Sequence, residues 1–396
     1  MLYKALIILV ALAVPLTFFG KAVIGITMSV ALLVSMAVLF RARARIFSEL
    51  PKSSILLSKE KISILVMLFI WLISAVQGIK PEESLKEVFE YAGIILGGGI
   101  IFAALNTGHL SFDLFIRWVI IPAAICATWL GLTPYIGQYA VEWSLTYGAV
   151  LAVIMPFALY QAWKKPRQFK YWICVFLITM GIFASGSRTA WVAFTLIVML
   201  FPFLFAWHGI RRRVLKIGLM AILMVGAALI GLNINKQVIG EQSFEMRTER
   251  MLTLDRPASG RLTVWENTIP LIEEKPLLGY GIKSAIDLQI EKAEGKEVLH
   301  VHNAILEMWL ETGLLGLLSI ITVIMVFVAH FLLSFFKASD VRLKQQGSTI
   351  FMACITYGIC SMALTSMFHA WWFLYLVVLL ILLKSAEIKL RHSIDQ

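Results

Sequence analysis

Long apolar runs separated by short polar stretches dominate the chain. A helix needs about 20 apolar residues to cross a hydrocarbon core of ~30 Å, and it must satisfy its backbone hydrogen bonds internally. The pattern therefore predicts an all-α polytopic membrane protein with about twelve transmembrane helices. The runs cover residues 2–19, 22–40, 61–77, 91–106, 114–133, 142–163, 171–184, 189–208, 215–232, 312–335, 348–366 and 369–384.

One long polar stretch, residues 233–302, separates the ninth and tenth runs. Within it, residues 259–274 have the period of an amphipathic helix, and Ser259 is suited to cap its start. A second helix is predicted to begin near Asn303 and to continue into the tenth run. We therefore expect a single membrane domain, residues 1–396, whose loop 233–302 is helical and carries part of the active site. The apolar face of the first loop helix is predicted to hold Leu262, Trp265, Ile269 and Ile272.

The composition agrees with insertion into a membrane. Apolar residues make up 60% of the chain and charged residues 15%, with a mean hydropathy of +0.84, whereas a soluble protein has about 25% charged residues. The net charge of +11 does not indicate nucleic acid, because the basic residues gather in short loops and not on a helix with interleaved aromatic residues. All four cysteines lie within apolar runs, so neither a disulfide framework nor a metal site of the Cys-x-x-Cys kind is predicted.

The distribution of lysine and arginine predicts the orientation of the chain. Basic residues concentrate in every second short loop, and the positive-inside rule places such loops in the cytoplasm. Both termini are therefore expected to be cytoplasmic and residues 233–302 to lie outside. The basic clusters fall in residues 41–61, 164–170, 211–216 and 337–344 and in the tail that contains Lys384, Lys389 and Arg391.

Two arginines on the expected outer side stand where a helix begins. Arg188 follows the turn Ser185-Gly186-Ser187, and Arg261 comes two residues after Ser259. A helix N-terminus disfavours cations and binds anions through its free N–H groups. Arginine adds a permanent charge and paired donors that suit phosphate. The two positions therefore predict anion binding, as on a lipid-linked phosphate.

More ordinary roles remain open for both arginines. Arg188 could anchor the chain at the membrane interface or pair with Glu142. Arg261 could form a surface salt bridge with Glu266 or Glu273.

His302 stands directly before the helix predicted from Asn303. A helix N-terminus keeps a nearby imidazole uncharged, which is the form that a general base needs. A solvated or interfacial histidine is the alternative. His300 and His302 are spaced to share a face if extended, but the nearby acids lack ligand spacing, so no metal site is predicted. The chain has no Asp-x-Asp pair for Mg²⁺, so arginines would have to neutralise a phosphorylated leaving group.

His302-Asn303 is followed, after nine residues, by Gly313-Leu314-Leu315-Gly316. This resembles the signature of the O-antigen ligase family, in which a histidine and Asn, Ser or Gln precede Gly-x-x-Gly by the same spacing. Ser187-Arg188 at the start of a run resembles the other arginine position of that superfamily, which also holds O-antigen polymerases. Further similar positions are Ser259-Gly260-Arg261, Trp265, Pro276, Gly279 and Gly281.

The resemblance implies a membrane glycosyltransferase of lipopolysaccharide biosynthesis. Such an enzyme transfers a glycan from undecaprenyl diphosphate to a sugar hydroxyl of lipid A–core oligosaccharide, on the periplasmic face of the bacterial inner membrane. The resemblance further implies inverting, metal-independent chemistry with no cofactor. On this chain, His302 would deprotonate the acceptor hydroxyl, and Arg188 and Arg261 would hold the donor diphosphate.

Two other functions remain open from the sequence. An O-antigen polymerase of the same superfamily would use a second lipid-linked glycan as the acceptor. A transporter or flippase of lipid-linked glycans belongs to a different class. Transporters bury charged groups near the membrane midplane and often contain repeats, whereas here the candidate residues lie at one surface and no repeat is found.

Overall fold

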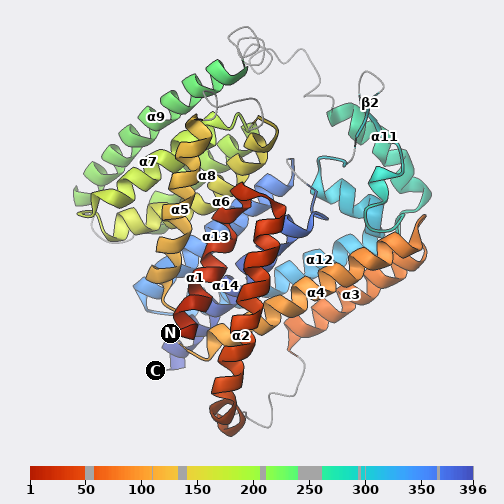
Figure 1. The fold of residues 1–396 in the computed structure, drawn as a ribbon, viewed down its shortest axis with the longest axis horizontal. Coiled ribbons are helices and arrows are strands. Elements are labelled where there is room, and N and C mark those ends of the chain that lie inside the picture. The colour runs from red at the N-terminus through yellow and green to blue at the C-terminus, as the bar shows by residue number, and fades with distance from the viewer. Residues whose placement is uncertain are drawn as a thin grey trace. The chain divides into compact units, whose positions relative to one another are not determined.

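Helices make up nearly all of the regular structure in the computed structural model (Figure 1). It describes residues 1–49, 58–108, 110–132, 141–205, 211–239, 261–292, 296–298, 300–363 and 366–395. These residues contain thirteen α-helices, two 3₁₀ helices and one short hairpin. The predicted all-helical class is confirmed, apart from this hairpin of two residues per strand. The single domain 1–396 stays a prediction, because the Cα positions group into two compact units.

Unit 1 combines residues 1–34, 108–254 and 339–360. Its central helix is α6, whose residues 147–162 are all buried. Helix α7 packs against α5, α6 and α9, and α6 also packs against α8. The elements are α1 (Leu2–Ala13), η1 (Pro15–Phe19), the first part of α2 (Lys21–Glu49), α5 (Phe112–Leu132), α6 (Val141–Lys164), α7 (Phe169–Ala184), α8 (Arg188–Phe205), α9 (Arg211–Ile239) and α13 (Val341–Ser361).

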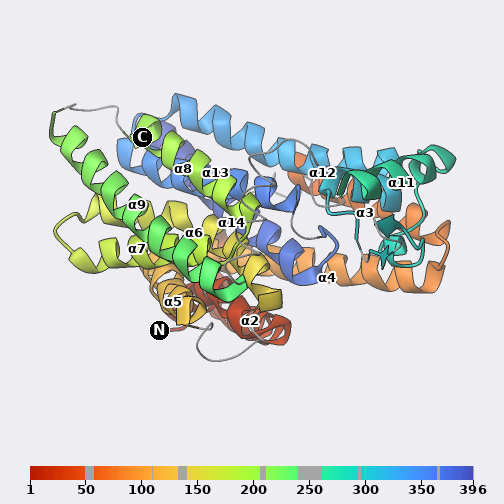
Figure 2. The same cartoon turned by 90° about the horizontal axis from the view of Figure 1, so that it is seen from above.

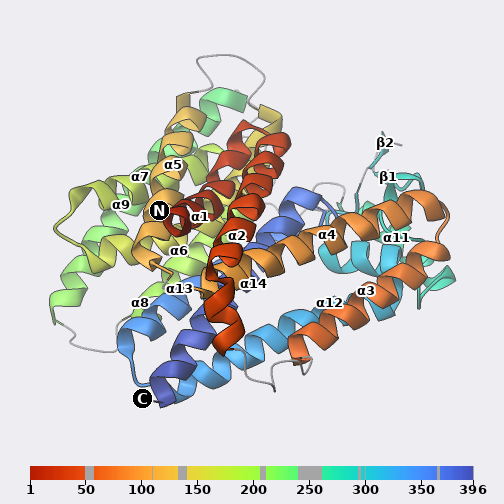
Figure 3. The same cartoon turned by 60° about the horizontal axis from the view of Figure 1, so that its bottom comes forward.

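Unit 2 combines residues 35–107, 255–338 and 361–396. Helix α12 packs against α3, α14 and α11, and α4 packs against α3 and α14 (Figures 2 and 3). A cluster of edge-to-face and tilted aromatic rings fills the space between them. Its members are Trp71, Tyr91, Phe368 and Phe373. The elements are α3 (Lys59–Val76), α4 (Pro81–Asn106), α11 (Arg261–Glu274), η6 (Ser284–Ile286), β1 (Glu291–Lys292), β2 (Lys296–Glu297), α12 (Ala304–Lys337) and α14 (Ala370–Asp395).

The prediction of about twelve spans is wrong, because only five described helices are long and apolar enough to cross a membrane. An apolar run is not always one long helix. Helix α1 ends at Ala13 and gives way to a 3₁₀ turn at Pro15, and α7 has only 16 residues. Three charged residues open α3. The five candidates, Ala22–Arg43, Pro81–Asn106, Phe112–Leu130, Leu145–Lys164 and Ala304–Lys337, still identify an integral membrane protein.

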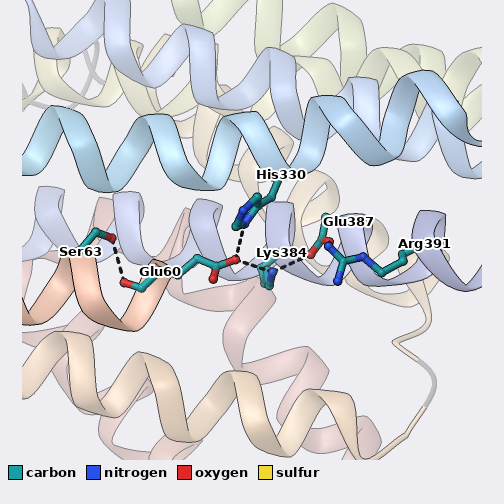
Figure 4. Close-up of polar contacts among 6 residues, drawn as sticks. All are labelled: Glu60, Ser63, His330, Lys384, Glu387 and Arg391. Atoms are coloured by element: carbon teal, nitrogen blue, oxygen red, sulfur yellow. Dashed lines mark hydrogen bonds and ion pairs between the residues drawn. The ribbon is translucent and has the colours of Figure 1, made fainter. Parts of the chain in front are cut away.

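A buried polar network ties three helices of unit 2 together (Figure 4). The Glu60 carboxylate of α3 lies 2.7 Å from Nδ1 of His330 on α12 and 2.5 Å from Nζ of Lys384 on α14. Glu387 bonds the same Lys384 at 2.7 Å and Arg391 at 2.8 Å. The side chains of Glu60 and Glu387 are only 8% and 1% exposed. The sequence pattern counted Lys384 among the basic residues of the expected cytoplasmic tail, and the structure adds that its side chain is partly buried and paired.

Replacing Glu60 by Gln should destabilise unit 2, because Lys384 and His330 lose the carboxylate that compensates their burial. We expect the free energy of unfolding to fall by about 2–4 kcal/mol. This is less than for a fully buried ion pair, because Lys384 keeps some contact with solvent. Thermal unfolding of the detergent-solubilised protein measures it. The matched control is Lys61→Gln, an exposed residue in the same helical turn; equal melting temperatures for both variants would contradict a stabilising network.

Candidate functional site

Arg188 is the first residue of α8, as predicted, and its side chain is exposed. The turn before it is held by its own serines. Ser185 Oγ accepts from the Ser187 N–H at 3.2 Å, and Ser187 Oγ caps the helix by accepting from Ala190 N–H at 3.3 Å. Gly186 supplies the left-handed conformation of the turn, with φ +70°. The sequence Ser-Gly-Ser thus explains why α8 starts here and why Arg188 stands at its N-terminus.

His302 directly precedes the N-cap of α12, and its backbone is left-handed, with φ +55°. Asn303 Oδ1 accepts from the N–H groups of Ile305 at 3.0 Å and Leu306 at 3.3 Å. This confirms the predicted helix start and explains why an asparagine follows the histidine. Because Asn303 is the N-cap, His302 lies just before the N-terminus of α12 and is not part of the helix.

Helix α12 is broken at Gly313, where φ is +69° and ψ is 178°. In an unbroken helix the N–H groups of Leu314 and Leu315 would bond the carbonyls of Leu310 and Glu311. Here those N–H groups instead donate to Pro276 O at 2.8 Å and to Leu277 O at 3.2 Å. The released carbonyls accept from the backbone N–H groups of the same crossing segment, residues 276–281.

The exchange is completed by Tyr280 N–H, which donates to Leu310 O at 3.0 Å, and by Gly281 N–H, which donates to Glu311 O at 2.8 Å. The two backbones approach so closely that a Cβ on Gly313 would overlap the backbone of Leu277. A Cβ on Gly279 would lie 2.6 Å from the carbonyl carbon of Glu311. The first glycine of the Gly-x-x-Gly motif is therefore a requirement of the scaffold and not part of the chemistry.

The buried Glu311 carboxylate fixes the rest of this loop to α12. It accepts from Lys283 N–H at 2.7 Å and from Ala285 N–H at 3.3 Å. Lys283 in turn forms a 2.6 Å ion pair with Glu87 of α4. On the side of α3, Ser74 Oγ donates to the carbonyls of Leu278 at 2.6 Å and Glu311 at 3.1 Å. The loop is thus clamped between α12 and the α3–α4 pair.

Helix α11 carries Arg261 as its first residue and packs on the same scaffold. Trp265 Nε1 donates to Val301 O at 3.2 Å, which ties α11 to the residue next to His302. The predicted amphipathic helix is confirmed from Arg261 to Glu274, whereas Ser259 and Gly260 lie outside the described residues. Its predicted apolar face is partly wrong: Leu262 and Ile269 are exposed, and the buried positions are Val264, Thr268 and Ile272. The reason is that Val264 and Ile272 join a cluster with Tyr280, Val301 and Leu310.

Three imidazoles gather beside Arg261 in unit 2. The ring centroids of His300 and His302 are 3.9 Å apart, and those of His300 and His369 are 6.0 Å apart. Burial and then the positive charge of Arg261 lower the pKa of His300 below its ordinary value of 6.5. The structure thus brings together Arg261 and His302, two of the three predicted site residues, through His300. The third predicted site residue, Arg188, belongs to unit 1.

No sequence pattern pointed to His369, because it lies 67 residues beyond His302 in an apolar run. It is placed by α12, because the Glu307 carboxylate accepts from Met367 N–H at 3.2 Å. Tyr91 of α4 also donates to Phe368 O at 2.5 Å. Among the described residues, no three His, Cys, Asp or Glu side chains are arranged to hold a metal ion.

Comparison with known proteins gives a family and several distant relatives. Residues 172–321 match the family model described as O-antigen ligase. An uncharacterized protein of Haemophilus influenzae is 25% identical over 171 residues, which is 40% of this chain and 42% of that protein. Two Rickettsia proteins are provisionally named polysaccharide ligases. The one from R. conorii is 27% identical over 42% of this chain and 40% of its own length, and the one from R. prowazekii 25% over 61% and 66%.

The matching region contains Arg188, Arg261 and the segment from His302 to Gly316. The chain matches less than two thirds of the length of these relatives.

Replacing Gly313 by Ala should disrupt the crossing of residues 276–281 with α12. The left-handed backbone costs about 1–2 kcal/mol for a residue with a Cβ, and overlap with Leu277 adds about 1–3 kcal/mol. We expect a clear fall in the thermal unfolding midpoint in detergent. Gly93→Ala in α4, where a Cβ meets nothing within 4 Å, is the matched control. A Gly313→Ala protein as stable as the Gly93→Ala protein would refute the close crossing.

Proposed function

Because the chain carries an O-antigen ligase family region, we propose that it is a polysaccharide ligase that transfers a glycan from undecaprenyl diphosphate to a sugar hydroxyl of lipid A–core oligosaccharide. The observation that carries this proposal is that Arg261 and His302 both lie next to His300 in unit 2. A base and a cation beside each other suit a reaction in which a hydroxyl loses a proton while a phosphate leaves.

In the proposed reaction, His302 accepts the proton of the acceptor hydroxyl. The hydroxyl oxygen then forms a bond to the anomeric carbon of the donor sugar. The bond between that carbon and the phosphate oxygen breaks, and the electron pair leaves with undecaprenyl diphosphate. A single displacement of this kind inverts the configuration at the anomeric carbon. The proton on His302 passes to the solvent, so the step needs no oxidant, reductant or cofactor.

Arg261 and Arg188 are proposed to hold the donor diphosphate and to stabilise the charge that develops on it. Each is the first residue of its helix, α11 or α8, where the free N–H groups of the first turn add to the attraction for an anion. The guanidinium charge is permanent and its fork can bind two phosphate oxygens at once. With these cations in place, the reaction is proposed to be metal-independent.

The proposed location is the bacterial inner membrane, with both termini in the cytoplasm and the site on the periplasmic face. The basic residues of the short loops support this orientation. The lipid tail of the donor would lie in the surrounding membrane, while the diphosphate stays at the interface with the His302 scaffold.

His302→Ala should lower the rate of transfer by about 10²–10⁴-fold, the usual contribution of a general base, and leave donor binding unchanged. Transfer is measured with purified protein, a defined undecaprenyl-diphosphate glycan and lipid A–core, in a buffer that contains EDTA. His392→Ala is the matched control, because His392 is exposed near the end of α14. Full activity of His302→Ala would remove the base assignment, and activity that requires added Mg²⁺ would contradict metal independence.

Arg261→Ala and Arg188→Ala should each slow transfer by about 10²–10³-fold, as expected for the loss of one charged donor to the leaving group. Arg261→Lys should recover only part of the rate, because lysine keeps the charge but lacks the paired donors. The same transfer assay measures these rates. The control is Arg117→Ala, an exposed arginine of α5 that bonds its own helix at Asp113 O. Rates equal to the control for both alanine variants would exclude the proposed diphosphate clamp.

The identity of the product tests the acceptor. Transfer to lipid A–core supports the ligase, whereas transfer to a second lipid-linked glycan identifies a polymerase. Movement of the donor across vesicle membranes with no new glycosidic bond identifies a transporter.

A further inference from the structure

His300 is a titratable residue that the proposed reaction leaves without a role. Its ring lies between two other imidazoles, at 3.9 Å from that of His302 and 6.0 Å from that of His369. Arg261 is close enough for its charge to act on His300. His369 lies outside the residues 172–321 that match the family model, so this cluster is assembled by the fold of unit 2.

The Nε2 atom of His300 is buried and has no hydrogen-bond partner within the described part of the chain. A buried polar atom without a partner is unfavourable, and in native proteins such atoms are rare and are found where a residue is strained, has a catalytic role, or meets water or an ion. The atom therefore offers a hydrogen bond to a molecule that enters the cluster.

Three acids of α11 and α12 form hydrogen bonds elsewhere. Glu307 accepts from Met367 N–H, and Glu311 accepts from Lys283 and Ala285 N–H. Glu274 at the end of α11 accepts from the Tyr280 hydroxyl at 2.8 Å. In the part of the chain that the structure describes, the charged or titratable groups shown to act on His300 are Arg261 from α11, His302 from its own loop and His369 from the segment before α14. Such surroundings repel cations and suit an anion.

We propose that His300, together with Arg261 and His369, forms a subsite for the donor's diphosphate, and that His300 takes up a proton when the diphosphate binds. This inference rests on the proposed function, which supplies the diphosphate. Nε2 would donate to a phosphate oxygen. The added proton converts His300 from a neutral hydrogen-bond partner into a cation and offsets one charge of the ligand.

The coupling follows from the electrostatics of the cluster. In the empty site, burial and Arg261 keep His300 neutral. A bound diphosphate reverses the balance, because an adjacent anion favours the protonated imidazole. Binding therefore strengthens as the pH falls from the pKa of the occupied site towards that of the empty site.

Calorimetry of donor binding in two buffers with different ionisation enthalpies counts the protons taken up. The probe is a farnesyl-diphosphate-linked glycan, whose phosphates keep constant charge near neutral pH because neither is a terminal monoester. Wild type should take up a measurable fraction of one proton, and at most one, for each donor bound. Its affinity for the donor should rise about 3- to 10-fold for each pH unit as the pH falls from 8 to 6. A farnesyl glycoside without phosphate should give no uptake.

His300→Gln should abolish the uptake and flatten the pH dependence, and His369→Gln should weaken binding. His392→Gln, an exposed histidine of α14, should behave as wild type. Binding without proton uptake, uptake that survives in His300→Gln, or uptake with the phosphate-free glycoside would each overturn the proposal.

A wild-type protein that binds the donor with proton uptake but transfers no glycan would keep the subsite and refute the ligase. Thermal unfolding identifies a His300→Gln protein that fails to fold; the proton count of the wild type with the two probes then decides, since it needs no substitution.

Discussion

The exchange of backbone hydrogen bonds at Gly313 is the constraint on which the candidate site depends. Helix α12 gives up two hydrogen bonds within itself at the break and forms four with residues 276–281. The two N–H groups and the two carbonyls that the break releases all find partners in this segment, as buried backbone groups require. It also fixes the loop that follows α11 onto the helix that follows His302. Main-chain hydrogen bonds thereby join the stretch after Arg261 to the helix after His302, and the Glu311 and Ser74 side chains add to them.

Unit 2 places its polar groups in two distinct regions of α12. Near its N-terminus are the capped turn after His302, the clamped loop and the imidazole cluster. Further along the same helix, His330 joins the network with Glu60 and Lys384 (Figure 4). In the first region, two imidazoles and the Arg261 guanidinium lie near the buried Nε2 atom of His300, which has no hydrogen-bond partner among the described residues. The second is closed by ion pairs, so it serves to hold α3, α12 and α14 together.

Local signals predicted local structure well. The helix start near Asn303, the helix that begins at Arg261 and the start of α8 at Arg188 all follow from chemistry within a few residues. Contacts between distant stretches were not predictable in this way. His369 and the partners of Glu60 come from segments far apart in the chain. The buried face of α11 likewise depends on packing against Tyr280 and Val301. The predicted number of spans was too high for two reasons that the described residues show. A 3₁₀ helix at Pro15 ends α1 early, and three charged residues at the start of α3 make it too polar to count as a span.

The measurement that tests the central claim most directly is a structure of the protein in lipid with the undecaprenyl-diphosphate glycan bound and His302 replaced to prevent turnover. The account predicts phosphate oxygens within hydrogen-bond distance of the Arg261 guanidinium group, with the anomeric carbon of the sugar facing the position of the His302 ring. Phosphates bound away from Arg261, or an anomeric carbon that faces away from the start of α12, would contradict it.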